Sequence, residues 1–265
     1  MFRLPTSRLF ALPEPVRDRQ AEWMDQAGLD PLEHRRALRG LARINAVSGS
    51  GRAILSELTK LARRLGPPRP LRILDLACGG GDVALDLARR APRRGLSVVV
   101  TGIDRAAEAI ALAREQAARA GLSNCLHFET ADVLSDPWPR APRTFGDTCS
   151  IKDDGRFDVV TCSLFLHHLD ESDATRLLTR MAAEAAHLVL ADDLERSRLG
   201  WAVAWVGTRL LSRSPIVHLD GPLSVRGAFT LAEAAELANR AGWRRIVVRR
   251  RFPFRYILSG EVSST

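Results

Sequence analysis

Residues 71–82 read LRILDLACGGGD, an apolar run that leads through Asp75 into three consecutive glycines. A second apolar run, Val98-Val99-Val100, leads into Gly102-Ile103-Asp104. This order of strand, glycine loop, helix, strand and acid is typical of a βαβ unit that binds a nucleoside. Asp104 lies 29 positions after Asp75 (104 − 75). The arrangement points to a ligand made of adenosine and an amino acid rather than to a dinucleotide.

Strand-like and helical segments alternate from residue 71 onward. The expected strands lie near residues 71–76, 98–103, 125–129, 157–163, 186–192, 244–249 and 252–258. The expected helices lie near residues 82–91, 105–120, 171–184 and 230–241. Because strands that alternate with helices form parallel sheets covered on both faces, we expect an α/β protein. Its sheet should be doubly wound, seven-stranded and mainly parallel.

The residues before this sheet are predominantly helical. Apolar residues recur at helical spacing between residues 17 and 65, and the proline-rich stretch 66–70 then breaks the pattern. Two units are therefore predicted, an N-terminal arm and helical lid over 1–68 and an α/β core over 69–265. Residues 194–229 form an apolar insertion in the core that could wall a substrate pocket.

Local signals mark several helix ends. Asp30-Pro31 is a favourable start, because aspartate caps a helix and proline suits its first turn. Thr230 and Glu233 have the spacing of a capping box. Gly121 and Gly242 stand where two helices are expected to end in a left-handed residue.

Composition limits the classes of protein that are possible. The 265-residue chain carries a formal net charge of +8, and only Lys60 and Lys152 among its 39 basic residues are lysines. No apolar run reaches the ~18 residues of a membrane span, and the first residues lack an export signal, so a cytoplasmic protein is expected. Of the four cysteines, Cys125 and Cys162 lie in expected strands and are predicted to be packed thiols.

Arginines gather near the C-terminus and could form a face that attracts phosphate groups. They are Arg240, Arg244, Arg245, Arg249, Arg250, Arg251 and Arg255. The alternative is a solvated strand face in an arginine-rich chain.

The glycine loop supplies most of the ligand-binding chemistry. Glycines 79–81 allow a tight turn and a close approach of the backbone, and the following helix presents free N–H groups to a carboxylate. The chain has no Gly-x-x-x-x-Gly-Lys-Ser/Thr pattern, which disfavours a nucleoside triphosphate. Asp104 can accept hydrogen bonds from two ribose hydroxyls. Asp132, after the third strand, could accept from an adenine amino group.

With these motifs the chain resembles the class I S-adenosylmethionine-dependent methyltransferases, by motif over residues 70–193 and by element order to about 258. The family has a Rossmann-like fold and opens with an acid and Gly-x-Gly-x-Gly, where this chain has Ala77 in place of the first glycine. The resemblance implies S-adenosylmethionine as cofactor and S-adenosylhomocysteine as product. The residues that it implies at the cofactor are Asp75, Ala77, Gly79, Gly81, Asp104, Arg105, Asp132, Val133 and Ser163.

A pair of histidines follows the fourth strand in Leu164-Phe165-Leu166-His167-His168. The Asn/Asp-Pro-Pro-aromatic motif of nucleic-acid amino-methyltransferases is absent, and the pair resembles the small-molecule branch of natural-product and quinone-pathway enzymes. Either histidine could remove a proton from a hydroxyl group, and Asp192 or Asp193 could orient it. A cofactor-side or structural role for His168 is the alternative. The turn has no carboxylate, so no metal is expected.

The leading hypothesis is methyl transfer to a hydroxyl oxygen of an apolar or phenolic small molecule. C-methylation of a phenol or quinol precursor is the alternative at the same site. An RNA or protein methyltransferase and a catalytically silent binding protein are the rivals from other classes. No nucleic-acid partner is expected, and the sequence leaves the oligomeric state open. His218 and Arg226 in the insertion are weaker candidates for substrate contact.

Overall fold

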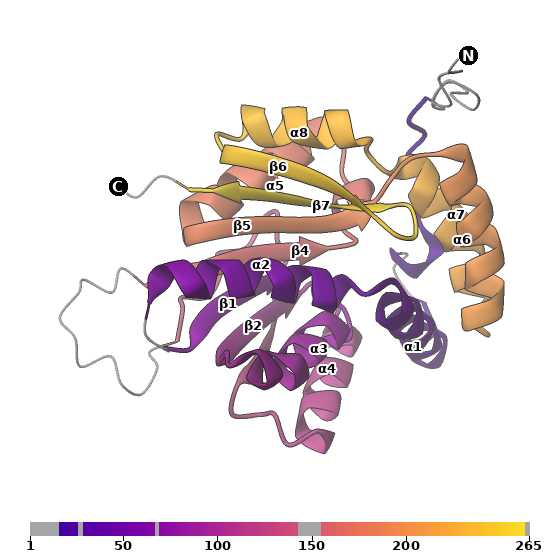
Figure 1. Cartoon of the computed structure of the whole chain (residues 1–265). Helices are drawn as coiled ribbons and strands as arrows, with labels where there is room; N and C mark the ends of the chain where they lie inside the picture. The colour runs from indigo at the N-terminus through magenta and orange to yellow at the C-terminus, as the bar shows by residue number, and fades with distance from the viewer. Residues whose placement is uncertain (1–15, 26–28, 67–68, 143–154, 263–265) are drawn as a thin grey trace, which may run out of the picture.

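A seven-stranded sheet forms the centre of the computed structural model, which describes residues 16–25, 29–66, 69–142 and 155–262 (Figure 1). Its strands are β1 (Leu71–Leu76), β2 (Val98–Asp104), β3 (Leu126–Thr130), β4 (Phe157–Ser163), β5 (Ala185–Leu194), β6 (Arg244–Arg251) and β7 (Arg255–Glu261). Their spatial order is β3-β2-β1-β4-β5-β7-β6, and β7 alone runs antiparallel to the other six described strands. The predicted fold class is confirmed.

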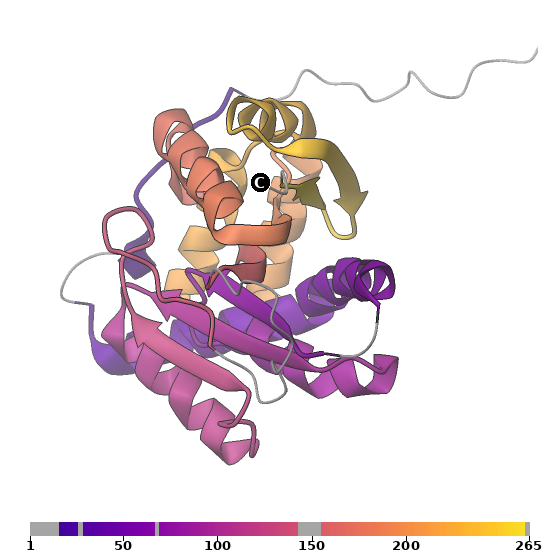
Figure 2. The same ribbon diagram turned by 90° about the vertical axis from the view of Figure 1, so that its left-hand side faces the viewer.

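Helices cover both faces of the sheet, as Figures 1 and 2 show. The helices are α1 (Pro31–Ser48), α2 (Ser50–Leu65), α3 (Asp82–Arg90), α4 (Ala107–Arg119), α5 (Glu171–Glu184), α6 (Arg198–Leu211), α7 (Pro215–Gly227) and α8 (Leu231–Arg240), with short 3₁₀ turns η1 (Trp23–Asp25), η2 (Ala91–Arg94) and η3 (Leu166–His168). One apolar core joins α2, α3 and α4 to the sheet, and a second joins α5 and α8 to the other face. Because both faces are covered, every residue of β1 and all but the last residue of β4 are buried.

The helical region before β1 divides between the sheet and the cavity described below. Ile54 and Leu58 of α2 are fully buried in the core against the sheet. The segment 16–25 instead packs on α7, where the Asp220 carboxylate accepts hydrogen bonds from the backbone N–H groups of Trp23 (2.9 Å) and Met24 (3.0 Å). Thus α2 belongs structurally to the α/β core, and the lid function remains a prediction for α1 and the residues before it.

Most predicted boundaries agree with the structure to within a few residues. Asp30 caps α1, Thr230 and Glu233 form the capping box of α8, and Gly121 and Gly242 have φ of 66° and 79°. The last hairpin differs, since β6 continues to Arg251 and β7 begins at Arg255. Proline has no N–H to donate to a ladder, so Pro253 falls in the turn instead of opening a strand.

Three further expectations concern cysteines, the N-terminal arm and membranes. Cys78 and Cys162 are buried free thiols and Cys125 is a half-buried one. Cys149 and residues 1–15 of the predicted N-terminal arm lie outside the described residues. Among the helices of the described residues, none is both long and apolar enough to cross a membrane.

Candidate active site

A cavity of about 800 Å³ opens at the carboxyl ends of β1, β2 and β4. Because parallel strands end at the same edge of the sheet, the loops that follow them meet there. The structure brings most of the residues implied at the cofactor to this cavity, namely Asp75, Ala77, Gly79, Asp104, Arg105, Asp132, Val133 and Ser163. Residues of α1 and of the segment 19–24 line the opposite side.

The glycine loop has a backbone that ordinary residues rarely adopt. Gly79 and Gly81 have φ of 52° and 76°, and Ala77 has φ of 51°. Gly81 is not among the residues that line the cavity. A Cβ atom at this position would lie 2.9 Å from the ring of Phe128, so the packing there requires glycine. Ala77 tolerates this left-handed conformation at a cost of roughly 1 kcal/mol, which a glycine would not carry.

Asp104 holds the loop in place. Its carboxylate accepts hydrogen bonds from the backbone N–H groups of Gly79 (2.8 Å) and Ala106 (2.9 Å). Each oxygen can accept a further hydrogen bond, and the carboxylate lines the cavity. Asp104 can therefore position the loop and hold ribose hydroxyls at the same time.

The floor of the cavity is rich in buried carboxyl groups. Asp75 is 1% exposed, and neither of its oxygens has a hydrogen-bond partner among the described residues. Burial, and then the charges of Asp82 and Asp104, raise the pKa of Asp75 to about 8. Burial also raises the pKa of Asp82 and of Asp104. Such a site favours a cationic ligand, because a positive charge beside these carboxyl groups stabilises their ionised form.

His167 lies beneath the cavity, buried between two carboxylates. Its Nδ1 is 2.6 Å from Asp193 Oδ1, its backbone N–H donates to Asp193 Oδ2 (3.1 Å), and its Nε2 is 3.5 Å from Glu22 Oε1. Burial alone lowers the pKa of His167, but the charge and hydrogen bond of Asp193, joined by Glu22, outweigh it and raise the pKa to about 10. The His167 ring is therefore positively charged at neutral pH. It is not among the residues that line the cavity.

His168 faces the cavity. It stacks on Phe165 with 5.8 Å between ring centroids, and both residues line the cavity. Its Nε2 lies 3.9 Å from Glu22 Oε2, and its backbone carbonyl accepts a hydrogen bond from Arg19 (3.1 Å). The two adjacent histidines thus occupy different environments, one internal and one at the cavity surface.

Glu22 is the residue of this site that sequence reasoning missed. It lies 145 positions before His167 (167 − 22), in a segment with no motif, and its carboxylate accepts a hydrogen bond from the Ser224 hydroxyl (2.6 Å). Glu22, His167 and His168 offer ligand atoms within 4.8 Å of one another. The histidine turn has no carboxylate in its own sequence, but the fold supplies one from elsewhere. Only the buried polar character of Glu22 marks it, and that requires the structure.

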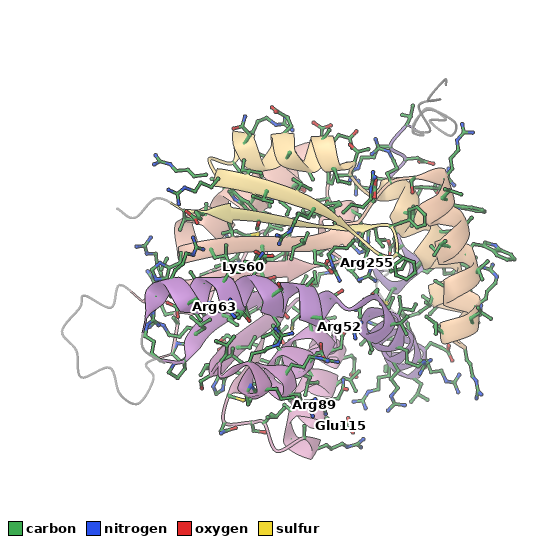
Figure 3. The ribbon with its side chains drawn as sticks, in the orientation of Figure 1. Arg52, Lys60, Arg63, Arg89, Glu115 and Arg255 are labelled. Carbon is green, nitrogen blue, oxygen red and sulfur yellow. The ribbon has the colours of Figure 1, made fainter. Side chains whose placement is uncertain are left out.

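Two neighbouring aspartates of β5 have separate partners. Asp193 contacts His167, whereas Asp192 pairs with Arg251 and lies 3.7 Å from Arg255. Side chains alternate across a strand, so adjacent residues point to opposite faces. The expectation that Asp192 could orient a histidine is therefore wrong, and Asp193 has that contact. Figure 3 shows the buried Arg255 beside the first turn of α2, where it donates to the Ser50 hydroxyl (2.7 Å).

Other candidates lie away from the cavity. His218 Nε2 is 2.8 Å from the Ser212 carbonyl oxygen, and Arg226 pairs with Asp18. Neither residue lines the cavity as described, so the structure does not support their predicted contact with substrate.

The C-terminal arginines are largely neutralised by carboxylates. Six of them form ion pairs: Arg240 with Glu171, Arg245 with Glu261, Arg249 with Glu57, Arg250 with Glu195, and Arg251 and Arg255 with Asp192. These side chains are thus engaged within the protein, which favours the strand-face interpretation over a phosphate-binding face.

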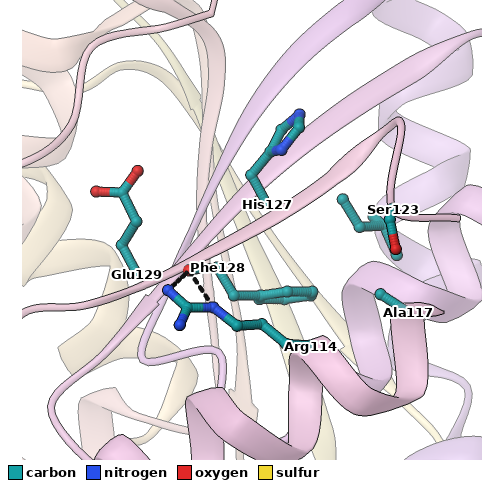
Figure 4. A pocket seen from close by; sticks show the side chains of 7 residues that line it. Arg114, Ala117, Ser123, His127, Phe128 and Glu129 are labelled. Carbon is teal, nitrogen blue, oxygen red and sulfur yellow. Dashed lines mark hydrogen bonds between the residues drawn. The ribbon is translucent and has the colours of Figure 1, made fainter.

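A second hollow of about 350 Å³ lies between α4 and the edge strand β3 (Figure 4). Arg114 lines it and donates to the Phe128 carbonyl oxygen from Nε (3.0 Å) and Nη2 (2.5 Å). None of the residues that line this hollow also lines the cavity above, so the two are separate.

Comparisons with known proteins agree with this geometry. Residues 73–185 match the family model described as a methyltransferase domain. The ubiquinone biosynthesis O-methyltransferase of Sodalis glossinidius is 26% identical over 84% of this chain and 71% of its own. The demethylmenaquinone methyltransferase of Thermus thermophilus is 39% identical over 46% of this chain and 47% of its own. Human N-acetylserotonin methyltransferase, solved in complex with S-adenosylmethionine, shares the fold with a TM-score of 0.58 at 16% identity, over 87% of this chain and 56% of its own.

The methyltransferase domain over residues 73–185 and the methyltransferases to which the chain is similar support a class I S-adenosylmethionine-dependent methyltransferase. The aligned residues cover 47% of the second and 56% of the third protein named above. S-adenosylmethionine is the cofactor, and the buried, unpartnered Asp75 and the left-handed glycine loop fit it, since the molecule carries both a sulfonium and an ammonium group.

Cofactor binding should release a proton from Asp75. The pKa of about 8 keeps this carboxyl largely protonated at pH 7, and a bound ammonium group beside it would favour the ionised form. The affinity for S-adenosylhomocysteine should therefore rise with pH up to about 8. Calorimetry at pH 7 in buffers of different ionisation enthalpy measures the proton directly, and Asp75→Asn should abolish the buffer dependence. A buffer-independent enthalpy in the unmodified protein would contradict this assignment.

Proposed function

We propose that this protein transfers a methyl group from S-adenosylmethionine to a hydroxyl oxygen of an apolar or phenolic small molecule, with His168 as general base. The observation that carries the proposal is the different burial of the two histidines. His168 lines the cavity with Phe165 and Leu169, whereas His167 has Asp193 and Glu22 at its two ring nitrogens. Two of the relatives are named a ubiquinone biosynthesis O-methyltransferase and a demethylmenaquinone methyltransferase, and these names support a substrate of this class.

The proton balance of the site favours His168 over His167 as the base. A general base must be neutral and must reach the proton that it removes. His167, with its pKa raised to about 10 and its ring buried, meets neither condition. Its role is to hold a positive charge between Asp193 and Glu22, which fixes the turn that presents His168. His167 and Asp193 are thus positioning residues.

The cofactor supplies an electrophilic methyl group on a sulfonium, and the protein supplies position and a base. Asp104 and the glycine loop fix the nucleoside half, and the acids near Asp75 favour the cationic half. His168 would take the proton of the acceptor hydroxyl while that oxygen bonds to the methyl carbon, and S-adenosylhomocysteine would leave as the bond between the methyl carbon and sulfur breaks. Transfer of this kind depends mainly on alignment, so a rigid loop and a positioned base account for most of the rate.

The segment 16–25 and α1 are proposed to exclude water from this cavity. Arg17 donates to the carbonyl oxygens of Leu169 (2.6 Å) and Gly227 (2.7 Å), and Glu22 contacts both histidines. These contacts attach the N-terminal segment to the catalytic turn. Water exclusion matters because it strengthens the electrostatic interactions in the site.

Carbon methylation is the second candidate function. Removing the proton of a phenol also makes the ortho ring carbon nucleophilic, so the same base serves both outcomes. The 39% identity to a demethylmenaquinone methyltransferase favours keeping a quinol precursor among the substrates.

The test uses a ¹³C- and ¹⁴C-methyl-labelled donor with the purified protein and a whole-cell extract. We expect label in the solvent-extractable fraction, lost with His168→Ala. The chemical shift of the labelled methyl carbon then distinguishes an O-methyl from a C-methyl product. Label confined to the acid-precipitable fraction would overturn the small-molecule proposal and favour a macromolecular substrate. Tight cofactor binding without any turnover would favour a silent binding protein.

Metal removal should leave the activity unchanged. The ligand atoms of Glu22 and the two histidines are close enough together to hold a metal ion. A positively charged His167, however, already balances the charge of the adjacent carboxylates without a metal. Dialysis against a chelator, followed by assay and elemental analysis, checks this. Loss of activity that added divalent ions restore would show that the three residues act as ligands instead.

A further inference from the structure

Helix α6 has an unusually apolar exposed surface. Only Gly200 and Thr208 of its fourteen residues are buried. A stripe of aliphatic side chains runs along the exposed face at spacings of four, three and four residues: Leu199, Val203, Val206 and Leu210. Leu199 is 67% exposed and Leu210 78% exposed. A surface helix normally turns such a stripe toward the core, so this one is available to a partner.

The tip of the β6–β7 hairpin extends this surface. Phe254 packs beside Gly200 of α6, with its Cβ 3.1 Å from where a side chain there would begin. Phe252, two residues earlier in the same turn, is 85% exposed. Figure 1 shows this hairpin tip next to α6 and α7, which lie together at the right-hand edge of the molecule. We call Leu199, Val203, Val206, Leu210 and Phe252 the α6 surface.

Tryptophan and arginine flank the aliphatic stripe. Trp201 and Trp205 are both exposed, and the Arg209 guanidinium lies 4.0 Å from the centre of the Trp205 ring. Arg198 and Arg213 are exposed near the two ends of the helix. The sequence from Arg196 to Leu219 contains no aspartate or glutamate. The charged flank of the α6 surface is therefore entirely positive.

We infer that the α6 surface binds the surface of a membrane that contains anionic phospholipids. Exposed aliphatic residues would enter the acyl region, tryptophans would lie at the level of the headgroups, and arginines would contact their phosphates. Charge decides between this partner and a second copy of the chain. Two copies meeting here would place arginine against arginine without an acid on α6 to pair with, whereas anionic headgroups complement the flank and the net charge of +8.

This inference is independent of the reaction. Because α6 packs against α7 and α1, and α1 lines the cavity, a membrane bound at α6 would lie on the insertion side of the site. A change at α6 that alters vesicle binding should leave turnover of a water-soluble acceptor unaltered. Failure of membrane binding and failure of the proposed methylation are thus separately measurable.

Vesicle flotation with the full-length protein tests the inference. Vesicles of phosphatidylcholine with phosphatidylglycerol should carry the protein to the top of the gradient, and pure phosphatidylcholine vesicles should carry much less. Leu199→Ser with Leu210→Ser should lower the partition coefficient at least about tenfold, because two anchors are lost. Arg198→Gln with Arg209→Gln should weaken binding to anionic vesicles and reduce its dependence on salt.

The matched control is Leu32→Ser with Val247→Ser, which removes two exposed apolar side chains, one of α1 and one of β6, that do not belong to the α6 surface. This variant should bind vesicles like the unmodified protein. Equal flotation of the unmodified protein and the Leu199→Ser, Leu210→Ser variant would overturn the inference. So would a dimer, measured by light scattering, that the same two substitutions dissociate, since the α6 surface would then belong to a second copy.

Discussion

Replacing His168 with alanine should lower kcat by about 10² to 10⁴, the range that general bases contribute, while the affinity for S-adenosylmethionine stays close to that of the unmodified protein. The expectation rests on its place at the cavity wall, where its ring stacks on Phe165. Steady-state kinetics gives kcat, and calorimetry with S-adenosylhomocysteine gives the cofactor affinity separately.

Added imidazole provides a sharper readout of the same variant. If His168 acts as a base, free imidazole should enter the space left by the side chain and restore part of the rate, in proportion to its neutral form. A purely structural histidine would show no such rescue. Unchanged kcat in His168→Ala would place the base elsewhere, and parallel losses of kcat and cofactor affinity would indicate that His168 supports the cofactor instead.

Replacing Asp193 with asparagine should lower the free energy of unfolding by about 3 kcal/mol, because it leaves the buried His167 charge without its principal partner. The pair is inaccessible to solvent, with Asp193 1% exposed and His167 4% exposed. Urea denaturation measures the change. A matched control is Asp18→Asn, which breaks the exposed pair with Arg226 and should cost less than about 1 kcal/mol.

The pH dependence of the same free energy follows from the direction of the shift. The pKa of His167 is about 10 in the folded protein and about 6.5 when unfolded, so its stabilising contribution is complete below about pH 6.5 and is lost as pH rises toward 10. The pKa values of Asp193 and Glu22 are lowered in the folded protein, so the stability that these two carboxylates contribute is lost as the pH falls. In Asp193→Asn the alkaline decline should become shallower. An unchanged decline would show that His167 is not its source.

Much of the cofactor site was predictable because its signals are local. Asp75 and Asp104 lie at the ends of β1 and β2, and the glycine loop and the residues after β3 follow a strand directly. Parallel strands bring such residues to one edge of the sheet. Strand and helix positions follow from hydrophobic periodicity, and the caps at Asp30 and Thr230 follow from side-chain chemistry within a few residues. The hairpin boundary was misplaced because the strand expected from residue 252 included Pro253, which has no N–H to donate to a strand ladder.

What the sequence determined by itself is therefore the class of fold, the cofactor edge of the sheet and the histidine pair. Only the tertiary structure decided which histidine meets the cavity and which aspartate meets a histidine, because burial and the alternation of side chains on β5 assign Asp193 to His167 and Asp192 to arginine. The contribution of Glu22, 145 positions before His167, also required the structure. Contacts of this range arise when α7 and β5 bring distant segments together, and no spacing within either segment encodes them.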